Sequence, residues 1–205
     1  MKKLLYLLPL FLVYACQENA GTRQAAPAAE NAAVQNPLAD LFEEKFVIKM
    51  HLFGMEGDAP EADYPYTGKP LSGDALAHLD ERLNPGDGAS LFACYHVENT
   101  DFYVLRSGRD LILGKWAQQA GKLEKVMDLA SKRCGTEGCQ QQDAWLTDLD
   151  DDRTFELVIR SRSTDPSGKV LAEDFTVLSQ NADGHFTKST EQLAGLAVMD
   201  RYVLH

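Results

Sequence analysis

The segment 148–156 crowds five carboxylates into nine residues and then runs into an apolar stretch. Four of these acids lie at positions 1, 3, 5 and 9 of the segment: Asp148, Asp150, Asp152 and Glu156. Alternate spacing lets several carboxylates of a tightly wound loop face one centre, and the backbone carbonyl of Thr154 adds a further oxygen. Calcium takes six to eight oxygen ligands in flexible geometry, so these five residues are expected to bind a calcium ion.

The electrostatic repulsion among these carboxylates must be offset by water, by a basic group or by a bound cation. Two carboxylates about 4 Å apart repel by several kcal/mol at an effective protein dielectric, and a divalent cation between them reverses the sign of that energy. The alternative is a solvated acidic turn without metal, in which Arg153, Arg160 and Arg162 balance the charge. An EF-hand is excluded, because it requires glycine at the sixth position and glutamate at the twelfth, where this chain has Arg153 and Ile159.

Residues 144–162 resemble the calcium loop of FG-GAP/VCBS repeats, in which Asp-x-Asp-Gly-Asp-Gly-x-x-Asp/Glu precedes an apolar strand. The four acids and the strand Leu157-Val158-Ile159 match that pattern, whereas Asp151 and Arg153 stand where it has glycine. The resemblance implies that the four acids supply the side-chain ligands. A complete propeller needs at least four blades. With one such loop, the chain is expected to form a blade-like or sandwich-like β domain.

The first residues have the order of parts of a secretory signal. Lys2 and Lys3 precede an apolar stretch, 4–13, which is shorter than the roughly 20 residues that span a bilayer and suits a signal peptide. Val13-Tyr14-Ala15-Cys16 then resembles a bacterial lipobox. The alternative is a buried N-terminal helix with an incidental cysteine.

The lipobox resemblance implies that residues 1–15 are removed and that Cys16 carries lipid. Gln17 follows the cysteine, where aspartate would suggest retention at the inner membrane, so an outer-membrane lipoprotein is expected. Residues 16–40 contain few large apolar side chains and are expected to form a flexible tether. Residues 41–205 suit one domain.

The net charge narrows the class of partner. The formal charge is −11, and removal of the leader takes away Lys2, Lys3 and no acid, which leaves 18 basic and 31 acidic residues, a charge of −13. Such a charge argues against nucleic acid, whose affinity comes from neutralised phosphates. It favours cations, solubility or a basic partner, so one hypothesis is an acidic inhibitor or accessory subunit of a basic envelope enzyme.

Three cysteines remain besides Cys16: Cys94, Cys134 and Cys139. Three pairings are possible, and we favour the local Cys134–Cys139 disulfide, with Cys94 buried and reduced. A zinc site formed by these cysteines and His96 is the alternative, although it lacks the tight double Cys-x-x-Cys spacing.

The periodicity predicts a mainly β (α+β) fold of antiparallel hairpins with one or two short helices. Strands are expected at 45–53, 90–97, 102–106, 110–116, 144–146, 155–160, 175–178 and 185–188, and helices at 72–83 and 191–201. Residues 122–133 fit either a helix or the second arm of a hairpin turned at 119–122, and we favour the hairpin. In the strand 155–160, Glu156, Val158 and Arg160 are expected to face outward.

A hydrolase is the main alternative function. Cys94 and His96 lie two residues apart in an expected strand, so their side chains would share a face and form a nucleophile–base pair; a carboxylate pair is a further option. No Gly-x-Ser-x-Gly, His-Glu-x-x-His or phosphate-loop motif is present. The favoured hypothesis is therefore a lipid-anchored envelope protein that binds a protein or glycan partner, with calcium as a structural ion.

Overall fold

The structure is a computed structural model that describes residues 36–57, 59–83, 90–149, 152–181 and 184–189. Its strands are β1 (Glu43–Lys45), β2 (Lys49–Phe53), β3 (Lys69–Pro70), β4 (Leu91–Val97), β5 (Phe102–Ser107), β6 (Asp110–Ala117), β7 (Lys122–Gly135), β8 (Gly138–Thr147), β9 (Glu156–Thr164), β10 (Val170–Gln180) and β11 (Phe186–Lys188). The expected mainly β fold is confirmed. Within the described residues, no helix is long and apolar enough to cross a membrane.

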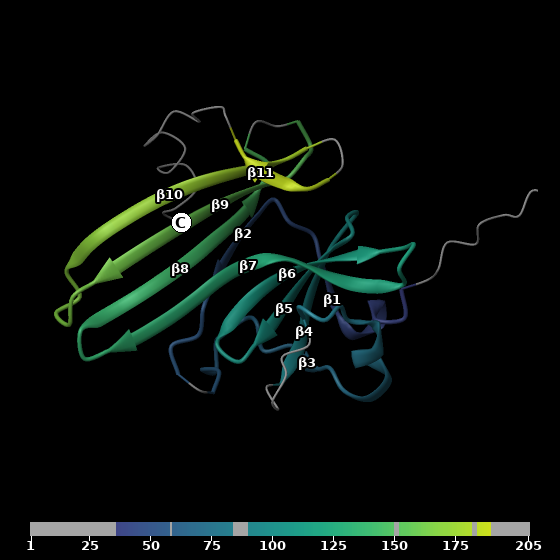
Figure 1. The fold of residues 1–205 in the computed structure, drawn as a ribbon, viewed down its shortest axis with the longest axis horizontal. Coiled ribbons are helices and arrows are strands. Elements are labelled where there is room, and N and C mark those ends of the chain that lie inside the picture. Colours follow the sequence, from purple (N-terminus) through teal and green to yellow (C-terminus); the bar gives the residue numbers. More distant parts are fainter. Residues whose placement is uncertain (1–35, 58, 84–89, 150–151, 182–183, 190–205) are drawn as a thin grey trace, which may run out of the picture. The chain divides into compact units, whose positions relative to one another are not determined.

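The strands form one continuous sheet in the order β1-β4-β5-β6-β7-β8-β9-β10-β11, with β2 beside β8 and β3 beside β4 (Figure 1). All neighbours are antiparallel except β1 and β4. The sheet has a first layer, which comprises β1, β3–β6 and the start of β7, and a second layer, which comprises the end of β7, β2 and β8–β11.

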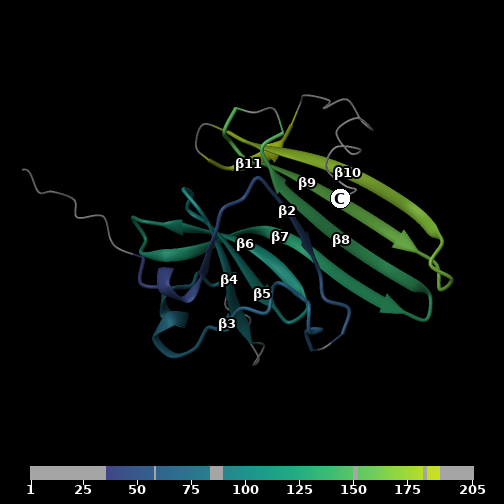
Figure 2. The same ribbon diagram turned by 180° about the vertical axis from the view of Figure 1, so that it is seen from behind.

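Strand β7 carries the chain from one layer to the other. Its residues 122–130 pair with β6, and its residues 131–135 pair with β8. The hairpin interpretation of 122–133 is therefore confirmed, and the turn lies at 118–121. The long course of β7 can be followed from both sides in Figures 1 and 2.

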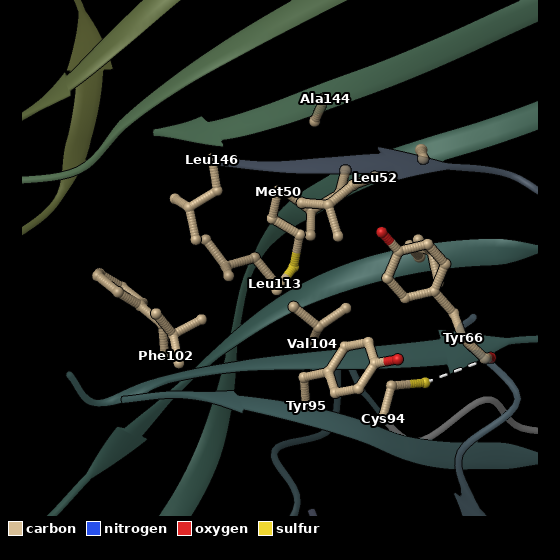
Figure 3. Packing of buried hydrophobic residues seen from close by; sticks show 14 of the residues in the cluster. Met50, Leu52, Tyr66, Cys94, Tyr95, Phe102, Val104, Leu113, Ala144 and Leu146 are labelled. Carbon is tan, nitrogen blue, oxygen red and sulfur yellow. Dashed lines mark hydrogen bonds between the residues drawn. The ribbon is translucent and has the colours of Figure 1, made fainter. Parts of the chain in front are cut away.

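The main core lies between the two layers. Met50, Leu52 and Leu146 of the second layer face Val104 and Leu113 of the first layer (Figure 3). A second core covers the opposite face of the first layer, where Leu105 and Trp116 pack against the segments that precede β1 and follow β3. Because the first layer is buried on both faces, its strands read as continuous apolar runs, and every residue from Phe102 to Arg106 is buried.

The expected strand 45–53 is divided in two. Lys45 pairs in parallel with Val97 of the first layer, and Lys49 pairs with Thr147 of the second. The chain changes layers at 46–48, so these residues cannot continue either ladder.

The expected helix at 72–83 is also different. Residues Gly73–His78 form a 3-10 helix, η2, and Ser72 makes no side-chain cap hydrogen bond. Leu79 and Leu83 are buried in the second core, whereas Leu76 is half-exposed. The apolar spacing therefore reflects tertiary packing of a short turn rather than a stable α-helix. Another 3-10 turn, η1, spans Ala39–Leu41, and the expected helix at 191–201 lies outside the described residues.

The outer face of the second layer is less polar than predicted. Glu156 and Val158 were expected to face outward into water, yet both are buried. Val158 lies opposite Trp145, whose indole is stacked against the imidazole of His51 with ring centroids 4.5 Å apart. Successive side chains of β9 do point to opposite faces of the sheet, but the residues at the start of the strand are buried on both faces.

This outer face also contains a fully buried carboxylate, Asp143. It accepts hydrogen bonds from Arg160 and from Gln141, the latter at 3.0 Å, and the Nε2 of His51 lies 3.9 Å away. Burial raises the pKa of Asp143, but the nearby His51 and the hydrogen bonds from Gln141 and Arg160 outweigh it and leave the pKa lowered. The carboxylate is therefore held ionised beside the Arg160 guanidinium.

We predict that Asp143→Ala lowers the free energy of unfolding by about 2–4 kcal/mol, because it leaves the partly buried Arg160 guanidinium, 15% exposed, without its partner. The pKa of Asp143 is lower in the folded state than the unfolded value of about 3.9. Its contribution is thus present above that value and is lost as pH falls through the folded pKa. Denaturant unfolding of wild type and variant should converge at acid pH. The exposed Asp174→Ala should change stability by less than about 0.5 kcal/mol, and an equal loss in both variants would contradict the account.

Candidate functional site

A cleft of about 910 Å³ opens at one end of the two layers. Its walls are the β1–β2 connection at 46–49, the β4–β5 turn at 98–101 and two parts of the β8–β9 loop, 147–148 and 153–155. Lys115 of β6 and Gln180 of β10 complete it. The acidic segment identified in the sequence therefore forms one wall of the cleft.

The turn at 98–101 is held by its own hydrogen bonds. The Thr100 hydroxyl donates to the Val97 carbonyl at 2.8 Å and accepts from the Phe102 N–H at 3.0 Å. The Trp116 N–H donates to the Asp101 carbonyl at 3.0 Å. This wall is thus fixed to β6.

Carboxylates of the acidic loop bind the loop's own backbone. Asp148 accepts from the Arg153 N–H at 2.9 Å, Asp152 accepts from the Thr154 N–H at 2.7 Å, and Glu156 accepts from the Leu149 N–H at 2.8 Å. Glu156 is buried. These contacts wind the loop tightly, as the alternate spacing of its acids requires.

One oxygen of this loop has no partner. The Oδ1 of Asp148 is buried and makes no hydrogen bond, although the other oxygen of the same carboxylate does. A buried acceptor without a donor costs about 1–3 kcal/mol or more when charged. A buried carboxylate oxygen without a hydrogen-bond donor is a ligand suited to a hard cation.

The expected calcium ligands do not all lie within the described residues. Asp150, the central acid of the expected set, lies outside them. Among the described residues, no group of three or more His, Cys, Asp or Glu side chains has the geometry to hold a metal ion. Asp148, Asp152, Thr154 and Glu156 lie in the described part of the chain, and the carboxylates among them do not form such a group.

Backbone strain also gathers at the cleft. Two non-glycine residues have positive φ in the described chain, Asn99 at 60° and Arg153 at 73°, and both line the cleft. Asparagine adopts this conformation readily, but arginine does so at a cost. Residues held in such conformations are common at functional sites.

The charges of the cleft are balanced. Lys49, Lys115 and Arg153 face three acids of the same walls, Glu98, Asp101 and Asp148. Apolar side chains line it as well, and two of them, Phe46 and Ile48, are largely exposed. The cleft therefore suits a mixed polar and apolar partner rather than a highly charged one.

The expectation that Cys94 and His96 share a face is wrong. A β-bulge between Ala93 and Tyr95 shifts the register of β4. Cys94 consequently lies in the main core, whereas the His96 ring stacks on Tyr103, which belongs to the second core, with centroids 4.6 Å apart.

The chemistry of the cysteines agrees with this separation. Burial raises the pKa of Cys94 to about 12, against a smaller lowering by Arg106, so its thiolate is scarce at neutral pH. Cys134 and Cys139 are joined by a disulfide at the β7–β8 turn. Their sulfurs are therefore not available for the four-residue zinc site considered from the sequence.

Sequence reasoning located the acidic loop but missed the cleft. Phe46 and Ile48 were part of the expected continuous strand 45–53, and that expectation did not indicate that they are exposed beside a cleft. Their exposure could have been predicted from the lysines that flank them, Lys45 and Lys49, because such flanking charges are unusual in a core strand.

Compared with family models, with curated proteins and with solved structures, the chain gives no match. The geometry of the cleft and its acidic wall, together with the sequence motifs, therefore carries the functional argument.

We predict that Arg153→Gly leaves the free energy of unfolding unchanged or raises it by up to about 1 kcal/mol. Glycine removes a left-handed strain of about 1–2 kcal/mol but adds about 0.4–1 kcal/mol of unfolded-state entropy. The matched variant Arg153→Ala keeps the strain and should show no gain in denaturant unfolding. A loss of stability in Arg153→Gly equal to or larger than that in Arg153→Ala would show that the backbone here is not strained.

Proposed function

We propose that this protein is a lipid-anchored binding module of the cell envelope, in which a structural calcium ion fixes one wall of the binding cleft. The observation that carries the proposal is the buried, unpartnered Oδ1 of Asp148 in a loop that lines the cleft. The proposed partner is a protein or glycan of the envelope, and nucleic acid is disfavoured by the charge of the chain.

The proposed ligands of calcium are the carboxylates of the loop and one carbonyl: Asp148, Asp150, Asp152, Glu156 and the backbone oxygen of Thr154. The ion would neutralise the repulsion between these groups. It would also link the end of β8 to the start of β9. Since an ion that binds the folded state alone adds its binding free energy to folding, calcium would stabilise the domain as well as the cleft wall.

The left-handed backbone at Arg153 supports the same assignment. In the repeat pattern that this loop resembles, glycine occupies that position, and glycine adopts positive φ without strain. The positive φ for which the pattern uses glycine is therefore present at Arg153, although this residue is not glycine.

The proposed membrane anchor is a lipid on Cys16, a residue outside the described part of the chain. It is supported by the order of a cationic start, an apolar stretch and the sequence Val13-Tyr14-Ala15-Cys16. Gln17 favours the outer membrane over the inner one. Of the expected flexible tether 16–40, residues 36–40 instead pack on the β domain, with Leu38 buried in the second core, so the part that precedes residue 36 would connect the lipid to the domain.

Binding is favoured over hydrolysis by the placement of the candidate nucleophile. Cys94 is buried in the core rather than in the cleft, and its pKa is raised to about 12. The cleft walls carry hydroxyl, amide and balanced charged groups, which suit recognition of a partner.

We predict that millimolar calcium raises the melting temperature of the full chain by about 2–8 °C. This range follows from a dissociation constant of about 10⁻⁴–10⁻³ M, typical of extracellular calcium modules, and from mass action and the size of the domain. The increase should disappear in Asp148→Asn, whose amide oxygen still accepts the Arg153 N–H but no longer carries a charge.

The matched control is Asp174→Asn, which removes the same charge from an exposed position on β10. It should retain the calcium-dependent increase measured by thermal unfolding. Equal increases in wild type and Asp148→Asn, or none in wild type, would reject the calcium site.

A further inference from the structure

The β1–β2 connection displays the most exposed large apolar side chains of the described residues. Phe46 is 71% exposed and Ile48 is 75% exposed. Val47, between them, is 8% exposed and belongs to the main core. All three residues line the cleft, but only the side chains of Phe46 and Ile48 are largely open to solvent.

The two side chains are held on a rigid support. On one side, β1 pairs with β4, and the Glu98 N–H donates to the Lys45 carbonyl at 3.0 Å. On the other side, β2 pairs with β8, and the Thr147 hydroxyl donates to the Ile48 carbonyl at 3.2 Å. The exposed pair is therefore presented by an ordered segment with both ends fixed, which lowers the entropic cost of inserting it into a partner.

Lysines lie at both ends of this segment, Lys45 and Lys49. Aromatic and aliphatic side chains flanked by lysines are the composition of segments that bury apolar groups at the headgroup boundary of a bilayer while the ammonium groups meet lipid phosphates. The acids Glu43, Glu98 and Asp101 lie nearby. Apolar insertion, rather than attraction to a strongly anionic surface, would therefore supply the affinity.

The order of the chain points to a bilayer rather than another partner. The proposed lipid-bearing tether enters the domain immediately before this segment. Its entry is fixed by Leu38 and Phe42, both buried in the second core, and by a 2.8 Å hydrogen bond from Asn36 to Tyr103. A tethered domain meets its membrane at high effective concentration, so two inserted side chains need only orient the domain at the bilayer and need not supply the anchoring.

We propose that Lys45–Lys49 is a membrane-docking segment, in which Phe46 and Ile48 insert at the interface of the bilayer that carries the lipid anchor. This inference rests on the proposed lipidation of Cys16. Docking would hold the mouth of the cleft at the membrane surface, so its partner would be met at or near that surface.

The test uses the full chain, processed and lipidated in its own envelope, with Phe46→Trp as the probe. The protein is reconstituted with calcium into vesicles of phosphatidylethanolamine and phosphatidylglycerol, with or without brominated acyl chains. Bromine quenches an indole that lies among the acyl chains. The native Trp116 and Trp145 are 4% and 1% exposed and give a constant background. The matched control is Leu171→Trp, which places the indole on β10 at another exposed apolar position, 63% exposed.

Docking predicts that brominated lipid reduces the emission added by the indole of Phe46→Trp at least twofold and leaves the emission added by the control indole unchanged. Ile48→Trp should behave as Phe46→Trp does, which guards against local misfolding of one variant. Vesicle flotation separates the two proposals. A chain that floats with an unquenched indole at position 46 overturns docking alone, whereas a chain that does not float overturns the anchor and the docking that rests on it.

Discussion

The constraint on which this account depends is the repulsion among the carboxylates that connect β8 to β9. Water cannot relieve all of it, because Glu156 is buried and one oxygen of Asp148 is enclosed without a donor. Backbone N–H groups of the loop satisfy part of the charge. A calcium ion would satisfy the remainder and would reinforce the loop between two strands that are already paired up to Thr147 and Glu156.

The same loop links stability to recognition. It forms a wall of the cleft opposite the β4–β5 turn, and the strained Arg153 lies on that wall. Any ligand that tightens the loop therefore also shapes the cleft. The chain crosses from the first layer to the second at 46–48, and this crossing places the exposed Phe46 and Ile48 on another wall of the cleft. The same crossing therefore contributes to both the binding cleft and the proposed membrane contact.

Local patterns predicted several first-layer strands well, because the turn residues that bound each apolar run act over a few residues. They placed β4, β5 and β6 almost to the residue. They failed where contacts between distant segments determine the local structure. The failures are the division of 45–53 between two layers, the 3-10 helix at Gly73–His78 and the bulge that puts Cys94 and His96 on different faces. The acidic loop was visible in the sequence, but the cleft beside it was not, because its walls come from segments about 50 residues apart.

Direct measurement of calcium bound to the full chain, by equilibrium dialysis at millimolar calcium with magnesium present, tests the central claim. The account predicts saturable binding of one calcium ion per chain, with a dissociation constant of about 10⁻⁴–10⁻³ M, because hard oxygen donors in a flexible loop suit calcium better than magnesium. Absence of saturable binding, or displacement of calcium by equimolar magnesium, would contradict it.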